Sequence, residues 1–165
     1  MNEPTTRDPV HRVSYAFEPD GDNLWVYTWL EPGGKLPEHF HPRQEERWEV
    51  LEGRARIQVG DAKPTLRPED GPQVVEPGVK HSVESVSDEV VRLRCHVLPA
   101  YDLQAFLEDS AQAARDGLIM RGGIPRGLRG ARWGARFVKR HRQETVMTFP
   151  PRFAQSAMIA LLARD

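Results

Sequence analysis

The chain of 165 residues has one cysteine, no long apolar run and almost no net charge. A single cysteine, Cys95, excludes an internal disulfide framework. The net charge of −1 argues against a protein that binds nucleic acid over much of its surface. No apolar stretch approaches the length that a transmembrane helix needs, and the N-terminal segment lacks the apolar core of a secretory signal. We therefore expect a cytoplasmic protein with one domain-sized core.

Charge and periodicity divide the chain near residue 100. Residues 1–100 carry a net charge of −6, whereas residues 101–165 carry +5. In the first part, short runs of alternating apolar and polar residues are separated by turn sequences such as EPDGD, EPGG and PEDGP. That pattern is typical of an all-β sandwich or barrel. We therefore expect a β-barrel domain over residues 10–100 and a mostly helical, basic extension over residues 101–165.

The extension contains two stretches with a helical period. Residues 103–114 place leucine, phenylalanine and alanine side chains on one stripe and are followed by Gly117. A second helix is predicted after the two prolines at positions 150–151, continuing towards the C-terminus. Because a closed barrel has no room for it, the first helix should pack outside the barrel or across a dimer. The Gly- and Arg-rich residues 122–134 between them predict no particular element.

A basic run connects these predicted helices. Eight Lys or Arg residues and no acidic residue lie between Arg121 and Arg142. Three interpretations are open: a solvated arm, an arm folded over the acidic barrel, or a helix on a membrane surface. The last is suggested by Trp133 and Phe137, four residues apart beside several arginines. No recognition motif accompanies the charge, so nucleic acid is not an expected partner.

Two histidines precede a predicted strand that begins with a glutamate. His39 and His41 are two residues apart, so on an extended segment both side chains leave the same face. The strand that follows must bury Trp48 and Val50, and the same parity turns Glu46 inward. A lone buried carboxylate is unfavourable unless it meets a cation or a metal. This stretch therefore predicts a metal site.

A third histidine begins a later predicted strand. His81 follows a glycine turn in PGVKHS and shares its parity with Val83, so it also points inward. Glu45 is the competing carboxylate, although its parity points it outward. Three imidazoles and one carboxylate, without a thiolate, suit one divalent transition metal, which can be Fe, Mn, Ni, Co, Cu or Zn. The predicted metal ligands are His39, His41, Glu46 and His81.

The spacing of these ligands resembles the conserved motifs of a known family. The first conserved motif of the cupin superfamily is matched by Gly33-x5-His39-x-His41-x4-Glu46-x6-Gly53. Residues 71–85 resemble the second motif through Gly71, Pro77, Gly78 and His81, although proline directly precedes Gly78 and Ser85 stands where many members have Asn. The resemblance covers about residues 10–100. It implies an all-β fold, the cupin-type double-stranded β-helix or jelly-roll barrel, here with a C-terminal helical extension, and the same four metal ligands.

The resemblance alone does not select an activity, because cupins include dioxygenases, isomerases, epimerases, decarboxylases, cyclases and binding or storage proteins. An intact donor set favours a mononuclear metal-dependent enzyme that acts on a small organic molecule. A dioxygenase is the leading hypothesis, with Glu46 as a catalytic base if it leaves the metal. A metal-dependent isomerase or cyclase and a non-catalytic cupin that binds a small molecule are the alternatives.

The alternation of residues along the strands also predicts which residues line a substrate pocket and how two chains assemble into a dimer. One predicted strand has Trp25, Tyr27 and Trp29 on one face and aliphatic residues on the other, so we expect a homodimer that buries the outer face. Cys95 points inward and is interpreted as an unreactive thiol. His11, His96 and His141 are not assigned as ligands, and His96 is interpreted as solvated. The predicted substrate pocket contains Tyr15, Val26, Trp48, Val50, Ile57, Val59, Val83 and Leu93.

Overall fold

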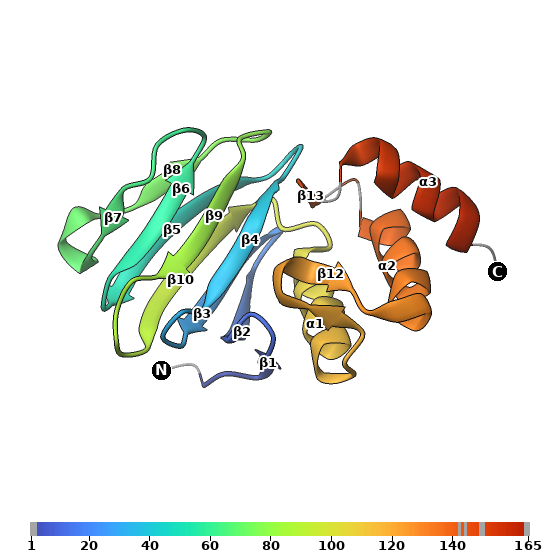
Figure 1. The fold of residues 1–165 in the computed structure, drawn as a ribbon. Helices are drawn as coiled ribbons and strands as arrows, with labels where there is room; N and C mark the ends of the chain where they lie inside the picture. Colours follow the sequence, from blue (N-terminus) through green and yellow to red (C-terminus); the bar gives the residue numbers. More distant parts are fainter. Residues whose placement is uncertain (1–2, 142, 144, 149–150, 164–165) are drawn as a thin grey trace.

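Two antiparallel sheets face each other, and three helices lie beside them (Figure 1). The computed structural model describes residues 3–141, 143, 145–148 and 151–163. One sheet contains, in spatial order, β1 (Thr6–Asp8), β2 (Val13–Asp20), β3 (Asn23–Leu30), β10 (Val91–Leu98), β5 (Glu45–Glu52) and β8 (Gln73–Val75). The other contains β13 (Val146–Met147), β4 (Lys35–Phe40), β9 (His81–Ser85), β6 (Ala55–Val59) and β7 (Thr65–Leu66). The predicted all-β jelly roll is confirmed.

Strict alternation places the core between the two sheets. In β3 every second residue from Leu24 to Leu30 is buried, while Trp25, Tyr27 and Trp29 are half-buried on the outer face. β10 pairs with β3 on one side and β5 on the other, and its buried residues include Cys95, as predicted. The homodimer expected from the aromatic face of β3 stays a prediction. The barrel starts before residue 10, because β1 pairs with β2.

The extension is helical, as predicted, but contains one helix more than expected. Its helices are α1 (Leu103–Arg115), α2 (Gly127–His141) and α3 (Arg152–Leu162). A short hairpin of β11 (Ile119–Met120) and β12 (Ile124–Pro125) separates the first two, and single 3-10 turns cover Pro68–Asp70 and Arg121–Gly123. None of the helices among the described residues is long and apolar enough to cross a membrane. Arg142 and residues 164–165, which end the basic run and the last predicted helix, lie outside the described residues.

The first helix lies beside the barrel, as predicted, and its apolar stripe is continuous with the barrel core. Leu103 and Phe106 of α1 are buried in the same hydrophobic cluster as the inward residues of the sheets. β13 adds a strand beside β4, pairing Val146 with Phe40. The interior of the barrel is open towards the extension, so its apolar residues reach α1. The main hydrophobic core therefore reaches from the barrel into α1, and a second, smaller cluster lies around Ala113, Ala114 and Ile119.

α2 corrects the interpretation of the basic run as a solvated arm. Trp133 and Phe137 stack with ring centroids 4.6 Å apart, and Phe137 packs against the main core. The aromatic face of α2 therefore packs against the rest of the molecule, with Trp133 and Phe137 half-buried. Two glycines allow this close packing: a Cβ on Gly130 would overlap the carbonyl oxygen of Leu118, and one on Gly134 would lie 3.0 Å from Pro125 Cγ.

The C-terminal end of α2 is held by acidic residues of α1 rather than by the acidic barrel. His141 is buried, with Nδ1 3.1 Å from Asp102 Oδ2 and Nε2 3.2 Å from Asp109 Oδ2. Arg140 Nη1 lies 2.9 Å from the same oxygen of Asp109. Basic side chains at a helix C-terminus also interact favourably with the helix dipole. These contacts fix α2 against α1.

We expect Phe106→Ala to destabilise the whole chain in one cooperative transition. Phe106 is 8 % exposed, and its ring centroid lies 4.9 Å from that of Phe137. Loss of this buried ring should lower the free energy of unfolding by about 3 kcal/mol in urea titrations. Phe153→Ala is the matched control, because that ring is 78 % exposed on α3 and should cost less than about 0.5 kcal/mol. Two separate unfolding transitions would show that the extension folds independently.

Candidate metal centre

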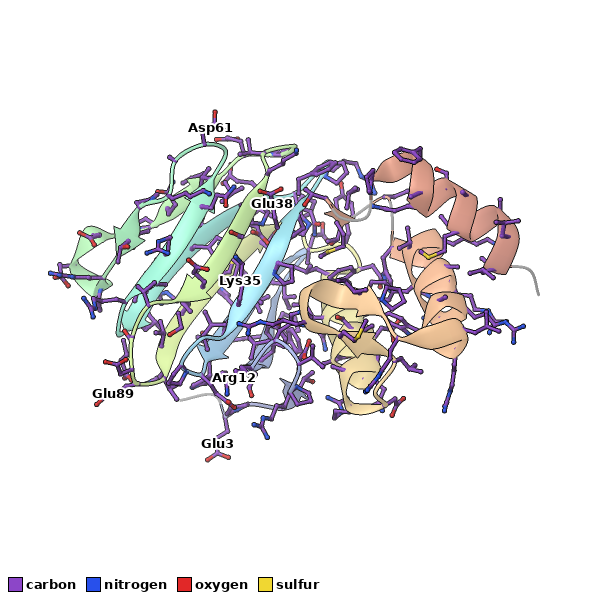
Figure 2. All side chains as sticks on the ribbon, viewed as in Figure 1. Glu3, Arg12, Lys35, Glu38, Asp61 and Glu89 are labelled. Atoms are coloured by element: carbon purple, nitrogen blue, oxygen red, sulfur yellow. The ribbon has the colours of Figure 1, made fainter. Side chains whose placement is uncertain are left out.

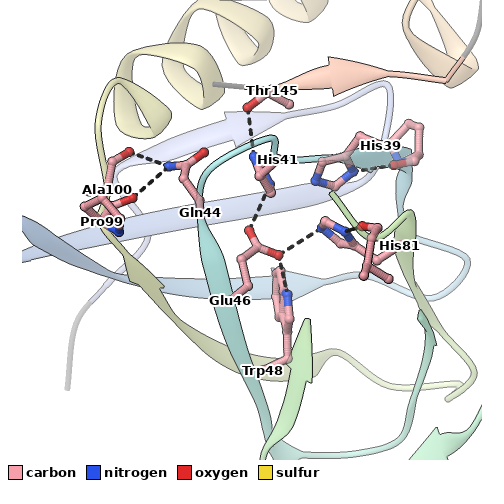
Figure 3. Close-up of polar contacts among 11 residues, drawn as sticks. His39, His41, Gln44, Glu46, Trp48, His81, Pro99, Ala100 and Thr145 are labelled. Carbon is pink, nitrogen blue, oxygen red and sulfur yellow. Dashed lines mark hydrogen bonds and ion pairs between the residues drawn. The ribbon is translucent and has the colours of Figure 1, made fainter. Parts of the chain in front are cut away.

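Four ligating side chains from three strands meet at one end of the barrel (Figure 3). His39 lies on β4, His41 directly follows it, Glu46 lies on β5 and His81 begins β9. Their ligating atoms all lie within 4.8 Å of one another. β4 and β9 are neighbours in one sheet, whereas β5 belongs to the other. The cluster therefore joins the two sheets.

The parity argument for these residues holds. Glu46 is 3 % exposed and shares the buried face of β5 with Trp48, while His41 and His81 are also buried and His39 is half-buried. Glu45 lies on the opposite face of β5. Its Oε1 is 2.6 Å from Arg47 Nε, outside the cluster.

The outer nitrogen of each imidazole is held by a neighbouring oxygen. His39 Nδ1 lies 2.8 Å from the Pro37 carbonyl oxygen, and His81 Nδ1 lies 3.0 Å from that of Val79. Since a carbonyl only accepts, both rings donate from Nδ1, so in its neutral form each ring presents the lone pair of Nε2 to the cluster. His41 Nδ1 lies 3.2 Å from the hydroxyl oxygen of Thr145, which can accept in the same way. Fixing the outer nitrogen in this way orients histidine ligands in metal sites.

The carboxylate of Glu46 lies between two of these rings. Its Oε1 is 3.1 Å from His41 Nε2, and its Oε2 is 2.9 Å from His81 Nε2. The indole Nε1–H of Trp48 donates to Oε2 at 2.8 Å, which fixes the orientation of the carboxylate. Because Trp48 stands two residues from Glu46 on the same face of β5, the strand itself supplies this bond.

The electrostatics favour the protonation states that a metal needs at Glu46 and His39, but oppose the neutral form of His81. Burial raises the pKa of the Glu46 carboxyl, but attraction and hydrogen bonding from His41 and His81 outweigh it and hold that pKa well below its ordinary value. Burial, together with repulsion from the other two rings, lowers the pKa of His39 well below its usual range. The pKa of His81 is raised, because the attraction of Glu46 outweighs the opposite effect of burial. A carboxylate anion and a neutral imidazole are thus available near neutral pH.

The donor set fits a divalent transition metal. Three nitrogens and a carboxylate converge in a buried space, and the outer nitrogens of the rings are already engaged. Mixed nitrogen and oxygen donors suit Fe, Mn, Co, Ni, Cu and Zn alike, so the residues do not select one ion. A metal at this point would be held by His39, His41, Glu46 and His81.

A partly open cavity of about 120 Å³ adjoins the cluster. His39 and Glu46 line it on the metal side. Its barrel wall includes Tyr15, Val26 and Trp48, all three predicted as pocket residues, and its other wall comes from the extension, including Leu103, Phe106, Trp133 and Phe137. The cavity therefore lies between the barrel and the helices.

The other five predicted pocket residues lie elsewhere. Four are fully packed in the hydrophobic core and Val59 packs against it, and the cavity lining contains none of Val50, Ile57, Val59, Val83 and Leu93. Their inward parity was predicted correctly, but these inward residues pack in the barrel core and do not line this cavity. The parity of a residue along its strand predicts which face of the sheet it lies on. It does not predict how far along the barrel axis the residue lies.

Three residues near the cavity were not predicted. Thr145 contacts His41 across 104 positions of sequence, which no local pattern reveals. Asp8 and His11 form a buried pair that lines the cavity, and their spacing of three residues was the only available signal.

His96, which was predicted to be solvated, is only partly so. Its ring stacks on Trp25 at a centroid distance of 4.1 Å, and its Nε2 lies 3.0 Å from Asp20 Oδ2.

Comparisons with known proteins agree with this geometry. A family model described as a cupin domain matches residues 26–98. The chain is 38 % identical over 104 residues to an oxidoreductase from Arthrobotrys oligospora, covering 58 % of this chain and 41 % of the relative. It is 31 % identical over 70 residues to the polyketide synthase CurC of Streptomyces cyaneus, covering 42 % and 45 %. The chain thus spans less than half the length of these relatives.

A solved structure supports the fold. KdgF from Halomonas sp. superposes with a TM-score of 0.52 at 17 % sequence identity, covering 60 % of this chain and 89 % of that one. At this identity the likeness concerns the arrangement of the strands alone.

We expect the purified chain to bind about one divalent ion, and two adjacent glutamates to respond differently to substitution. Glu46→Gln should lose most of the metal, because it removes the anionic ligand from the cluster. Glu45→Gln is the matched control and should retain the wild-type content, since its side chain points away. Elemental analysis of both variants decides this. Equal losses, or a wild type that cannot be reconstituted with any of the six metals, would contradict the site.

The extension should influence metal affinity through Thr145. Thr145→Val removes the hydroxyl beside His41 Nδ1 and should weaken the affinity by about tenfold or more, as is usual when such an orienting bond is lost. Thr148→Val is the matched control, because its hydroxyl donates to the Glu38 carbonyl at 3.1 Å and not to a ligand. Competition with a chromophoric chelator measures both affinities. Equal affinities in the two variants would show that Thr145 does not orient His41.

Proposed function

Because the barrel of this chain belongs to the cupin superfamily, we propose that the protein is a mononuclear metal-dependent oxidoreductase of the dioxygenase type, acting on a small organic molecule. One observation carries the proposal. Of the four converging ligands, His39 and Glu46 line a mostly apolar cavity, so a molecule in that cavity lies against the metal site. A metal with a purely structural role would have no need of such a space.

A bound iron or manganese ion would supply the redox chemistry that a reaction with O2 requires. The chain itself provides a preorganised donor set, in which Trp48 and the outer hydrogen bonds fix the ligands before anything binds. The aromatic and aliphatic lining of the cavity excludes water and holds an apolar body. The name of the Arthrobotrys oligospora relative, an oxidoreductase, supports this class of reaction.

Glu46 is the proposed catalytic base among the ligands. It lines the cavity, and its pKa is held low by His41 and His81 against the effect of burial, so the carboxylate is ionised. The hydrogen bond from Trp48 keeps its Oε2 in place if the other oxygen changes partner. A proton removed from a substrate could therefore be accepted at Glu46 without rearrangement of β5.

A second candidate, a metal-dependent isomerase or cyclase, is favoured by a different relative. The Streptomyces cyaneus protein is named a polyketide synthase, a name that specifies no reaction with O2. In that case a bound metal would supply only the charge that polarises a carbonyl group, and the same four residues would hold it. A binding protein without catalytic activity would also use this cavity, but would convert nothing.

Oxygen consumption separates these functions. Protein reconstituted with iron or manganese should consume O2 with at least one member of a panel of phenolic, thiol and diketone compounds, and should stop when a chelator removes the metal. The zinc-loaded protein is the control, because zinc is redox-inert. Conversion of a compound by the zinc form, without O2 uptake, would favour the isomerase or cyclase instead. Saturable binding without conversion by any metal form would favour a binding protein.

A further inference from the structure

A second buried polar group borders the cavity, on the side formed by β1 and the turn that follows it. His11 Nδ1 lies 2.7 Å from Asp8 Oδ2, and the two side chains are only 7 % and 4 % exposed. Asp8 Oδ1 accepts the backbone N–H groups of Val10 at 2.8 Å and His11 at 3.0 Å. The backbone N–H groups of the turn thus fix the orientation of the Asp8 carboxylate. The carboxylate then fixes the orientation of the His11 ring.

The remaining nitrogen of His11 has no partner. Its Nε2 is buried and makes no hydrogen bond to any residue that the structure describes. A buried polar atom without a partner is costly, so such an atom beside a cavity indicates a ligand. Since Asp8 holds Nδ1, Nε2 is the only polar atom of the ring that a molecule in the cavity can meet. In the neutral ring, Nδ1–H donates to Asp8 and Nε2 carries the lone pair.

His11 also lies at the boundary between the cavity and an outer groove of about 490 Å³. His11, Pro37 and Met147 line both spaces. The groove is bordered by Lys35 and Glu38 of β4, whose side chains are labelled in Figure 2.

We propose that His11, held by Asp8, is the proton acceptor for a small hydroxyaromatic molecule bound in the cavity between this pair and the metal cluster. The inference rests on the proposed function and specifies both the class of substrate and a second catalytic residue. It concerns residues of β1 and its turn, which supply no metal ligand.

The shape and lining of the cavity favour a single aromatic ring. Its volume of about 120 Å³ is close to that of an engineered protein cavity of about 150 Å³ that binds benzene. Five aromatic side chains surround it: Tyr15, Trp48, Phe106, Trp133 and Phe137. Aromatic rings pack well against such a lining. A hydroxyl on the bound ring then finds a polar partner at His11, and a second oxygen finds one at the metal side.

The other titratable groups on the cavity wall are unsuited to accept this proton. Burial and the nearby charge of Asp8 raise the pKa of Tyr15, so its phenol stays protonated. Burial, reinforced by the charge of Glu46, raises the pKa of the Cys95 thiol well above its usual value. Asp8 is already occupied by two backbone N–H groups and the imidazole. Away from the metal ligands, His11 is the remaining acceptor.

The proton transfer balances without a further reactant. The O–H bond of the substrate hydroxyl breaks, its electron pair stays on the oxygen, and the proton forms an N–H bond at His11 Nε2. The imidazolium that results faces the carboxylate of Asp8, 2.7 Å from its other nitrogen. An aspartate in this position stabilises the imidazolium and orients the ring, as in hydrolase triads.

Nitrogen NMR of the wild-type protein tests the proposal directly. Protein labelled with 15N-histidine and loaded with zinc is titrated with 4-nitrocatechol, whose visible absorbance reports binding and ionisation. We expect the Nε2 resonance of His11 to move from the position of an unprotonated nitrogen to that of a protonated one at saturation. His96, which pairs with Asp20 on the outer face of the barrel, is the internal control and should not respond.

Matched variants give a second measure. His11→Gln should weaken 4-nitrocatechol binding by about tenfold, the usual effect of losing a charge-assisted hydrogen bond, while the metal content is unchanged. His96→Gln should bind like the wild type. If His11→Gln does not fold, the wild-type spectra alone decide.

The outcomes distinguish this inference from the proposed function. A saturated, metal-loaded protein whose His11 resonance does not move would overturn the inference and leave the metal site intact. A protein that holds no metal, but whose His11 still takes up a proton from the bound catechol, would support the inference and overturn the metal-dependent function. Absence of any binding of 4-nitrocatechol to the wild type at millimolar concentration would also overturn the inference.

Discussion

A carboxylate buried between two sheets needs polar partners from both, and Glu46 obtains them from three strands. Its own strand, β5, supplies the Trp48 indole N–H, while His41 after β4 and His81 of β9 lie across from it at 3.1 and 2.9 Å. Without those partners, burial would force the carboxyl group to stay protonated. The two sheets must therefore stay in their relative position for the Glu46 carboxylate to keep its polar partners.

The C-terminal extension also contributes to the cluster around Glu46. Thr145 lies beside the outer nitrogen of His41, and β13 pairs with β4, the strand that carries His39. α1 contributes Leu103 and Phe106 to the core and to the cavity wall. The extension thus contacts the metal ligand His41 through Thr145 and forms one wall of the cavity through α1. Both contacts make it part of the site.

The parts of the site that follow from strand parity could be predicted from sequence. Alternation along β5 separates Glu46 from Glu45, and the separation of His39 from His41 by two residues places both on one face of an extended segment. α2 could not be predicted in this way, because its glycines lower helix propensity. Those glycines are explained only by the close approach of Gly130 to Leu118 and Gly134 to Pro125, which is a tertiary contact. The contact between Thr145 and His41 is equally invisible to any local pattern.

The cavity has two walls of different origin, one from the barrel strands and one from α1 and α2. The barrel wall carries the ligands, whereas the helical wall, to which α3 adds Gln155, carries residues such as Phe106 and Phe137 and none of the four ligands. Residues of the second wall can therefore change in size and shape without touching the donor set. Evolution could adapt such a chain to new molecules by exchanging its helices, while the chemistry inherited with the barrel stays constant.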